Sequence, residues 1–158
     1  MRVEYINPFV ESAYNILTEV LKEEVQRGDL YLKNAAMPML GVAAIIGLAG
    51  DVEGRVLFDM TKETGVKVAS AMLSSMDMEP VSELNEMARA TLTELANMIT
   101  GQAVTKLHNL GFKFDLTPPA IFTGDNMSVS DANFEALIVP MELPMGKIEI
   151  NVAVRERA

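Results

Sequence analysis

Residues 41–60 read GVAAIIGLAGDVEGRVLFDM, and this stretch decides the fold class. The apolar run 41–50 reads as a buried strand, although periodicity alone does not separate a short strand from a buried helix. Residues 55–60 alternate between apolar and polar side chains as a second strand would, and residues 51–54 supply turn-forming types between them. The stretch therefore predicts a β-hairpin.

Helical patterns lie on both sides of this hairpin. Thr61 is a good N-cap for a helix that continues to about Ser75. Before the hairpin, Asn7 and Pro8 suit the cap and first position of a helix running to about Gln26, with apolar residues at helical spacing. Gly28 is expected to end that first helix, and residues 29–33 to form a short strand. A long helix is predicted from Ser82 to His108, with Asn109 and Gly111 at its end. The predicted elements after it are a strand at 120–123, a polar loop at 124–131, and a hairpin of strands 134–143 and 147–154.

This order of elements suggests two similar halves, each a long helix followed by a hairpin. We therefore predict an α+β fold, with long helices packed on a mainly antiparallel sheet. Identity between the halves is faint, so the internal pseudo-two-fold repeat is a suggestion. At this length, residues 1–158 are expected to form one domain.

Composition excludes several functions. A net charge of −9 disfavours nucleic acid and anionic membranes as partners, because both require a basic surface. The absence of cysteine and the presence of one histidine, His108, rule out thiolate and multi-histidine metal sites. Residues 1–5 lack the apolar stretch of a signal peptide, and residues 41–50 are too short to span a bilayer. We expect a cytoplasmic protein.

One face of the long helix carries candidate chemistry. Glu94 and Asn97 are three residues apart, so their side chains point the same way, and the small residues Ala90 and Gly101 flank them. Because the flanking residues are small, Glu94 and Asn97 would stand out from an open helix surface that another protein could contact. The spacing is weak evidence alone, because Glu and Asn recur on helix surfaces by chance. The opposite, core-facing side is predicted to hold Leu84, Met87, Ala88, Thr91, Leu92, Leu95, Met98 and Ile99.

Gly101 is unusual because glycine inside a helix costs roughly 1 kcal/mol relative to alanine. Close approach of a partner, or close helix packing or a helix break, would explain it equally well. His108 is expected to be a favourable cation at the helix end rather than a base. Most of Met72, Met76, Met78 and Met87 are expected to fill the core, although such residues can also form an adaptable contact surface.

Several segments resemble a known family. Residues 94–101 (ELANMITG) and 115–119 (DLTPP) are similar to the signature region of the CheX type within the CheC/CheX/FliY phosphatases of bacterial chemotaxis. Residues 7–13, 53–60 and 69–73 resemble the same family, so the similarity runs from about residue 5 to residue 154.

The resemblance implies a CheC-like fold and a mechanism. The substrate would be the aspartyl-phosphate of a phosphorylated CheY-like response regulator. Asn97 would orient the attacking water, and Glu94 would pair with the receiver's lysine, with Ala90 and Gly101 beside the partner. The chain would need no cofactor of its own, because the receiver would supply Mg²⁺.

The family pattern also differs from this chain in two places. Ala90 stands where the family has Asp or Ser, and Pro118 and Pro119 lie closer to Asn97 than the family's proline usually does. CheC relatives carry a second site, whereas the first helix here offers Glu11 and Tyr14 without an Asn. A single site favours the CheX branch, whose members form homodimers by joining sheets.

Two other functions remain open from the sequence. A non-catalytic receiver-binding or dimeric adaptor would keep the fold and bind phosphorylated receiver without accelerating phosphate loss. A small-molecule sensor with a methionine-lined pocket is a weaker alternative, because no motif supports it.

Overall fold

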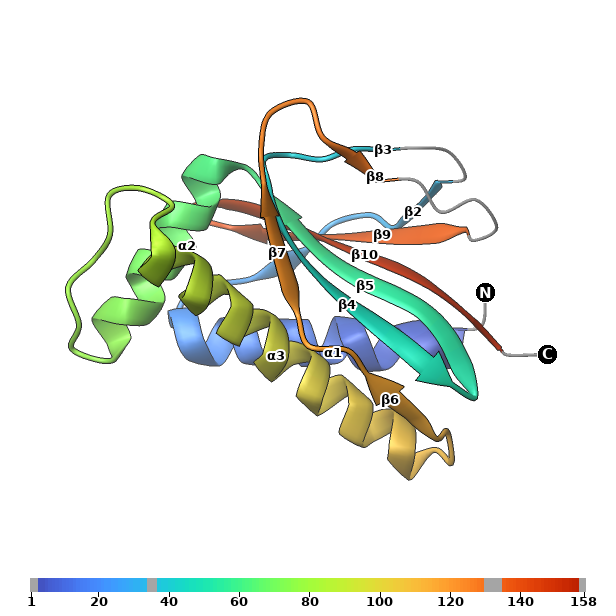
Figure 1. The fold of residues 1–158 in the computed structure, drawn as a ribbon. Helices are drawn as coiled ribbons and strands as arrows, with labels where there is room; N and C mark the ends of the chain where they lie inside the picture. Colours follow the sequence, from blue (N-terminus) through green and yellow to red (C-terminus); the bar gives the residue numbers. More distant parts are fainter. Residues whose placement is uncertain (1–2, 34–36, 130–134, 157–158) are drawn as a thin grey trace.

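The computed structural model describes residues 3–33, 37–129 and 135–156, and it places the helices on one face of an antiparallel sheet (Figure 1). This is the predicted α+β class. The elements in chain order are α1 (Val3–Leu21), β1 (Gln26–Arg27), β2 (Tyr31–Lys33), β3 (Met37–Pro38), β4 (Val42–Gly50), β5 (Val52–Met60), α2 (Lys62–Ser75), α3 (Glu86–Asn109), β6 (Phe114–Leu116), β7 (Ala120–Thr123), β8 (Ser128–Val129), β9 (Ala136–Leu143) and β10 (Gly146–Glu156).

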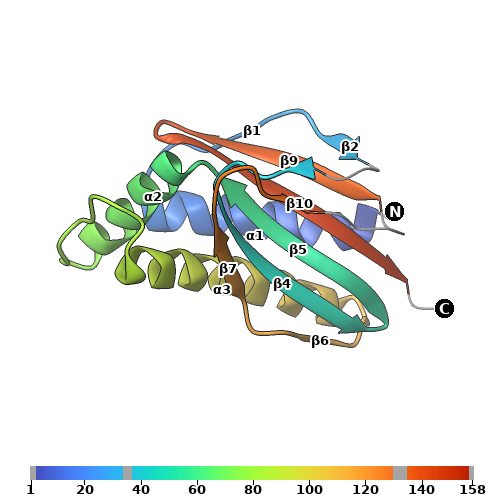
Figure 2. The same cartoon turned by 45° about the horizontal axis from the view of Figure 1, so that its top comes forward.

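The main sheet is built from two β-hairpins that pair with each other at its centre. Its strand order is β1-β9-β10-β5-β4-β6, with β2 also paired to β9 and β7 to β4, while β3 and β8 form a separate pair. The hairpins β4–β5 and β9–β10 meet where β5 pairs antiparallel with β10. Helices α1 and α3 lie side by side under the sheet (Figure 2). This arrangement is the one expected if each half contributes a long helix and a hairpin.

The central hairpin is confirmed, but its turn is tighter than predicted. Strand β5 begins at Val52, because that side chain is buried in the core and its backbone pairs with Glu156. Gly54 has φ +139°, and a Cβ there would clash with the Ala153 carbonyl of β10. A glycine at this position therefore permits a close strand contact and does not mark a turn.

The predicted bounds of α1 were wrong at both ends. The helix begins at Val3 and includes Pro8, because Tyr5 and Ile6, which precede the proline, are buried in the core. Burial of these side chains offsets the hydrogen bond that proline cannot donate. The helix ends at Leu21, where the next residue, Lys22, adopts a left-handed φ of 53°. Gly28 does not end it, and Gln26 already belongs to β1.

The other two helices are capped by side chains. Thr61 caps α2 as predicted, accepting a hydrogen bond from the Thr64 N–H at 3.1 Å. The start predicted for the long helix, Ser82, was wrong, because Asn85 caps α3 instead through a 2.9 Å bond from the Ala88 N–H. Gly111, with φ +98°, follows the end of α3.

The second half follows the prediction with small differences. Strand β7 occupies the predicted residues, and the closing hairpin is present, with β10 longer at both ends. The predicted start of β9 at Phe134 lies outside the described residues. The short strands β3, β6 and β8 were not predicted, and β8 replaces part of the expected polar loop. In the described ranges, no helix is long and apolar enough to cross a membrane.

Candidate functional site

The outer face of α3 presents the predicted site residues to solvent. Glu94 and Asn97 are both exposed, and so are Ala90 and Gly101 on either side of them. The opposite side of the helix is anchored in the core by Leu92, Leu95, Ala96, Ile99, Ala103 and Leu107. The structure therefore brings the predicted residues together on one accessible helix face.

The side chains of Glu94 and Asn97 have no hydrogen-bond or ion-pair partner among the described residues. A carboxylate can accept hydrogen bonds or pair with a cation, whereas a carboxamide can donate and accept at once. Both groups are thus available to a molecule that approaches this face.

Side-chain hydrogen bonds fix the helix beneath these two residues. The Thr91 hydroxyl donates to the Met87 carbonyl at 2.7 Å, and the Thr93 hydroxyl donates to the Arg89 carbonyl at 2.8 Å. Further along, the Lys106 ammonium pairs with the Glu11 carboxylate of α1 at 3.1 Å. These contacts and the buried face of α3 hold the site on a rigid element.

Gly101 is not required by the packing of this chain. It lies inside the continuous helix α3, and a Cβ built there would meet no atom within 4 Å apart from the adjacent backbone of its own helix. Close helix packing and a helix break, two of the explanations that the sequence left open, are thereby removed. Close approach of another molecule, the other explanation that the sequence offered, stays a prediction.

The methionine prediction was wrong for three of the four residues. Met72 is buried, but Met76, Met78 and Met87 are 55%, 43% and 47% exposed. Met76 follows the last residue of α2, and Met78 lies beyond that helix end, where the chain turns outward. Met87 was also assigned wrongly to the core face of α3. Together with Ala90, Glu94 and Met98, these residues line an open groove of about 420 Å³.

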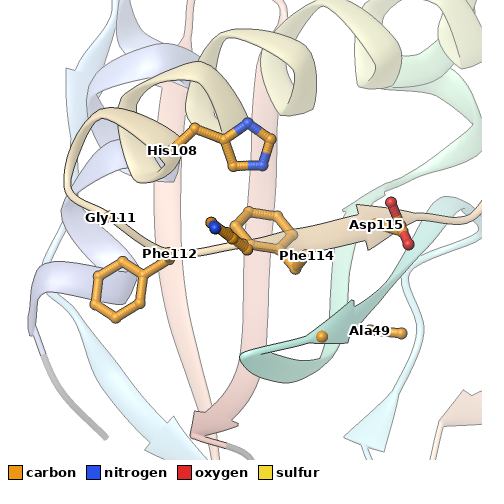
Figure 3. Close-up of a pocket in the computed structure, with 8 residues that line it drawn as sticks. Ala49, His108, Gly111, Phe112, Phe114 and Asp115 are labelled. Atoms are coloured by element: carbon orange, nitrogen blue, oxygen red, sulfur yellow. The ribbon is translucent and has the colours of Figure 1, made fainter.

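A second groove lies at the opposite end of α3 (Figure 3). His108 lies over Phe114, with ring centroids 5.2 Å apart, and Asp115 follows on β6. His108 is exposed in the last turn of α3, the position expected for a helix-end cation. No cluster of three or more metal-ligating side chains is found among residues 3–33, 37–129 and 135–156.

Two buried carboxylates, and a tyrosine that hydrogen-bonds to one of them, were missed by the sequence analysis. Asp59 and Glu149 face each other across β5 and β10, and the Tyr31 hydroxyl donates to Glu149 at 2.7 Å. Burial raises the pKa of Asp59 to about 6, against the opposing effect of the hydrogen bond from the Leu40 N–H. Burial and Glu149 likewise raise the pKa of Tyr31 to about 12. The presence of acidic residues within apolar strand sequences could have indicated these buried carboxylates.

These groups belong to the scaffold. Val56, Phe58 and Met60 of β5 pack in the main core with the helices. Because neighbouring residues in a strand point to opposite faces, Asp59 lies on the sheet face away from the helices. It is therefore separated from Glu94 and Asn97 by the sheet and the helical layer.

Comparisons with known proteins identify the family. Residues 42–142 match the family model of the chemotaxis phosphatase CheX. The CheY-P phosphatase CheX of Thermotoga maritima is 30% identical over 129 residues, covering 82% of this chain and 81% of that protein.

Solved structures agree with this match. The CheX–CheY–BeF₃–Mg²⁺ complex from Borrelia burgdorferi contains a chain that is 44% identical, with a TM-score of 0.83 and coverage of 98% of this chain and 100% of that one. A CheC-like superfamily protein from Shewanella sp. PV-4 is 25% identical, with a TM-score of 0.87 and coverage of 98% and 99%. The chain therefore belongs to the CheX family of chemotaxis phosphatases, and it is a response-regulator phosphatase, as its motifs predicted.

Proposed function

We propose that this chain hydrolyses the aspartyl-phosphate of a CheY-like response regulator, with Asn97 orienting the attacking water and Glu94 pairing with the receiver's lysine. The observation that carries the proposal is the exposed pair on α3, which no described residue binds and which Ala90 and Gly101 flank. The relatives support the choice of substrate, since one is named a CheY-P phosphatase and another was solved in complex with CheY, BeF₃ and Mg²⁺.

An amide is suited to positioning a water, because it can donate and accept hydrogen bonds at once. The Asn97 carboxamide can accept one hydrogen bond from a water and donate another to a nearby oxygen, which fixes the water for in-line attack. Catalysis of phosphoryl transfer depends largely on such positioning and on charge stabilisation. No covalent nucleophile from this chain is needed.

Glu94 would contribute through charge. A carboxylate one helical turn from Asn97 can form a charge-assisted hydrogen bond with a lysine ammonium, which is stronger than a bond between neutral groups. Such a bond would hold the receiver so that Asn97 enters its phosphorylated pocket. Glu94 is therefore proposed to act in docking as well as in positioning.

The proposal assigns the metal to the partner. Mg²⁺ would belong to the receiver, where it neutralises the phosphoryl oxygens, and this chain would supply no cofactor of its own. The Mg²⁺ in the B. burgdorferi complex is consistent with this division. A cytoplasmic location is part of the same proposal.

A homodimer joined through its sheets is also proposed. Strands β6 and β7 lie outside β4 at one side of the main sheet, and β1 and β2 lie outside β9 at the other. Backbone groups at an outer strand can pair with a second copy of the chain. Sedimentation equilibrium over a range of concentrations would test it, and a monomer throughout would reject it.

Dephosphorylation kinetics test the proposed reaction. A set of radiolabelled CheY-like receivers is followed with and without the chain, and with the variants Asn97→Ala and Glu94→Ala. Acceleration is expected for at least one receiver, with loss of acceleration in Asn97→Ala and weaker binding as well in Glu94→Ala. Unchanged rates in both variants would reject the residue roles, and binding without acceleration by the unaltered chain would indicate an adaptor.

A further inference from the structure

The groove beside Glu94 is formed where all three helices of the described chain meet. Its walls include Met76 and Met78, after the end of α2, and Met87 and Met98 on α3. Ala90 and Glu94 form the wall that it shares with the site face of α3. We call it the methionine groove.

We propose that the methionine groove binds an apolar side chain of the phosphorylated CheY-like receiver, close to that receiver's phosphorylation site, and so selects the partner. This inference rests on the proposed function, because it supplies a second contact for the same docking event. The occupant is a protein side chain with basic neighbours.

Distance along α3 places the groove under the docked receiver. Met87 and Asn97 are ten residues apart, which corresponds to about 15 Å of helix at 1.5 Å per residue. A small domain is about 30 Å across. A receiver centred on Asn97 therefore covers the part of the groove lined by Ala90, Glu94 and Met98, and reaches about as far as Met87.

The exposed methionines favour a protein surface as occupant. Scattered apolar side chains are ordinary on a protein surface, but a gathering of them marks an interaction site. Three exposed methionines converge here from two separate segments of the chain. Their flexible side chains adapt to the shape of a partner, as methionines do at other binding surfaces.

The acidic residues around the groove indicate that the side chain bound there should have basic neighbours. Asp77 lies between Met76 and Met78, Glu79 follows them, and Glu86 precedes Met87, and all three acids are exposed. Glu94 is a further carboxylate on the groove wall. An apolar side chain flanked by lysine or arginine therefore complements the groove, and an acidic partner surface does not.

Methyl NMR on the unaltered chain tests this contact directly. The methionine ε-methyl groups are labelled with ¹³C, and the probe is a CheY-like receiver, loaded with BeF₃ and Mg²⁺, that the chain dephosphorylates. The signals of Met76, Met78 and Met87 are expected to shift or broaden on binding. Met127, which precedes β8 in another part of the molecule, is the internal control and should not change.

Kinetics of a double variant give an independent readout. Met76→Ala combined with Met87→Ala is expected to raise KM about tenfold, with kcat within about twofold, because it removes only apolar contact area. The matched control is Leu110→Ala, which truncates an exposed side chain just after α3 and should leave both constants unchanged. Both altered positions are exposed, so the fold should be retained.

The outcomes separate this inference from the proposed function. Acceleration by the unaltered chain without changes at Met76, Met78 and Met87 would overturn the groove and leave the function standing. Methyl shifts that follow the concentration of the chain alone would assign the groove to a second copy and overturn the inference. Shifts and a raised KM in the groove variant, with full kcat in Asn97→Ala, would keep the groove and reject the assigned catalytic residue.

Discussion

The two long helices of this fold offer the same positions but different side chains. Aligning Glu11 of α1 with Glu94 of α3 gives four matched, exposed positions on each helix. These are Asn7, Glu11, Tyr14 and Thr18 on α1, and Ala90, Glu94, Asn97 and Gly101 on α3. In the α3 set an amide stands three residues after the carboxylate, where α1 has a tyrosine, and the flanking residues are smaller.

The carboxylates of the two sets also differ in their partners. Glu11 is paired with Lys106, an α3 residue, at 3.1 Å, whereas no described residue pairs with Glu94. Tyr14 fills the position that corresponds to Asn97. The backbone of this fold therefore provides two helix faces, and side chains alone make one of them a candidate site.

Reciprocal exchange at the amide position should have the largest effect. Asn97→Tyr gives α3 the pattern of α1 and should lower the rate acceleration by about 10²-fold or more, because misplacing the attacking water has an effect of that size. Tyr14→Asn should add no activity, since Glu11 remains paired with Lys106. Receiver dephosphorylation rates check both variants, and a gain of activity in Tyr14→Asn would break the comparison.

The second largest effect should be the difference in receiver binding between variants of Glu94 and Glu11. Glu94→Gln should weaken receiver binding by roughly tenfold to a hundredfold, because a hydrogen bond to a charged group contributes about 1.5–3 kcal/mol. Glu11→Gln should leave binding unchanged and lower the free energy of unfolding by about 1 kcal/mol at most, since it breaks an exposed ion pair. Titration calorimetry with a BeF₃-loaded receiver and urea unfolding measure these effects; equal loss of binding in both variants would contradict the assignment.

Substitution of Gly101 should change stability and receiver binding in opposite directions. Gly101→Ala should raise the free energy of unfolding by about 0.5–1 kcal/mol, because alanine is the better helix residue and its Cβ would point into open space. The same variant should weaken receiver binding if the partner approaches α3 closely. Thermal unfolding and receiver titration check the two effects. A stabilised variant with unchanged binding would remove the role assigned to this glycine.

Asp59 should show the smallest effect on activity, because it lies on the other face of the sheet. Its folded-state pKa of about 6 is above the ordinary value of 3.8, so stability should fall as pH rises from about 4 to 6 and then level off. The fall should be about 1–2 kcal/mol, since one pKa unit corresponds to about 1.4 kcal/mol and solvent screens part of it.

The variant Asp59→Asn isolates this effect. It keeps an oxygen that can accept from the Leu40 N–H, so the loop contact can remain while the titration is removed. Urea unfolding at several pH values should show a flatter profile than the unaltered chain, with dephosphorylation unchanged. A large loss of activity would show that the two faces of the sheet are coupled.

Much of the fold could be predicted because its signals are local. The apolar run in residues 41–50 and the alternation in 55–60 identified the central hairpin, and Thr61 marked the start of α2. The exposed face of α3 followed from helical periodicity. These signals act within one element, so they can be interpreted without knowing what packs against it.

The errors arose where a distant contact decides the outcome. Burial of Tyr5 and Ile6 extends α1 past Pro8, and pairing with β10 makes Val52 part of a strand. The exposure of Met76 and Met87 depends on how the ends of α2 and α3 are placed, which no local pattern specifies. Strands as short as β3 and β8 form only because each pairs with the other.

A crystal structure of this chain bound to its receiver, loaded with BeF₃ and Mg²⁺, would show whether Asn97 and Glu94 have the proposed roles. We expect the Asn97 amide inside the receiver's pocket, within hydrogen-bond reach of a water in line with the beryllium, and the Glu94 carboxylate on the receiver's lysine. A complex docked through α1, or one that leaves Asn97 outside the pocket, would contradict the account.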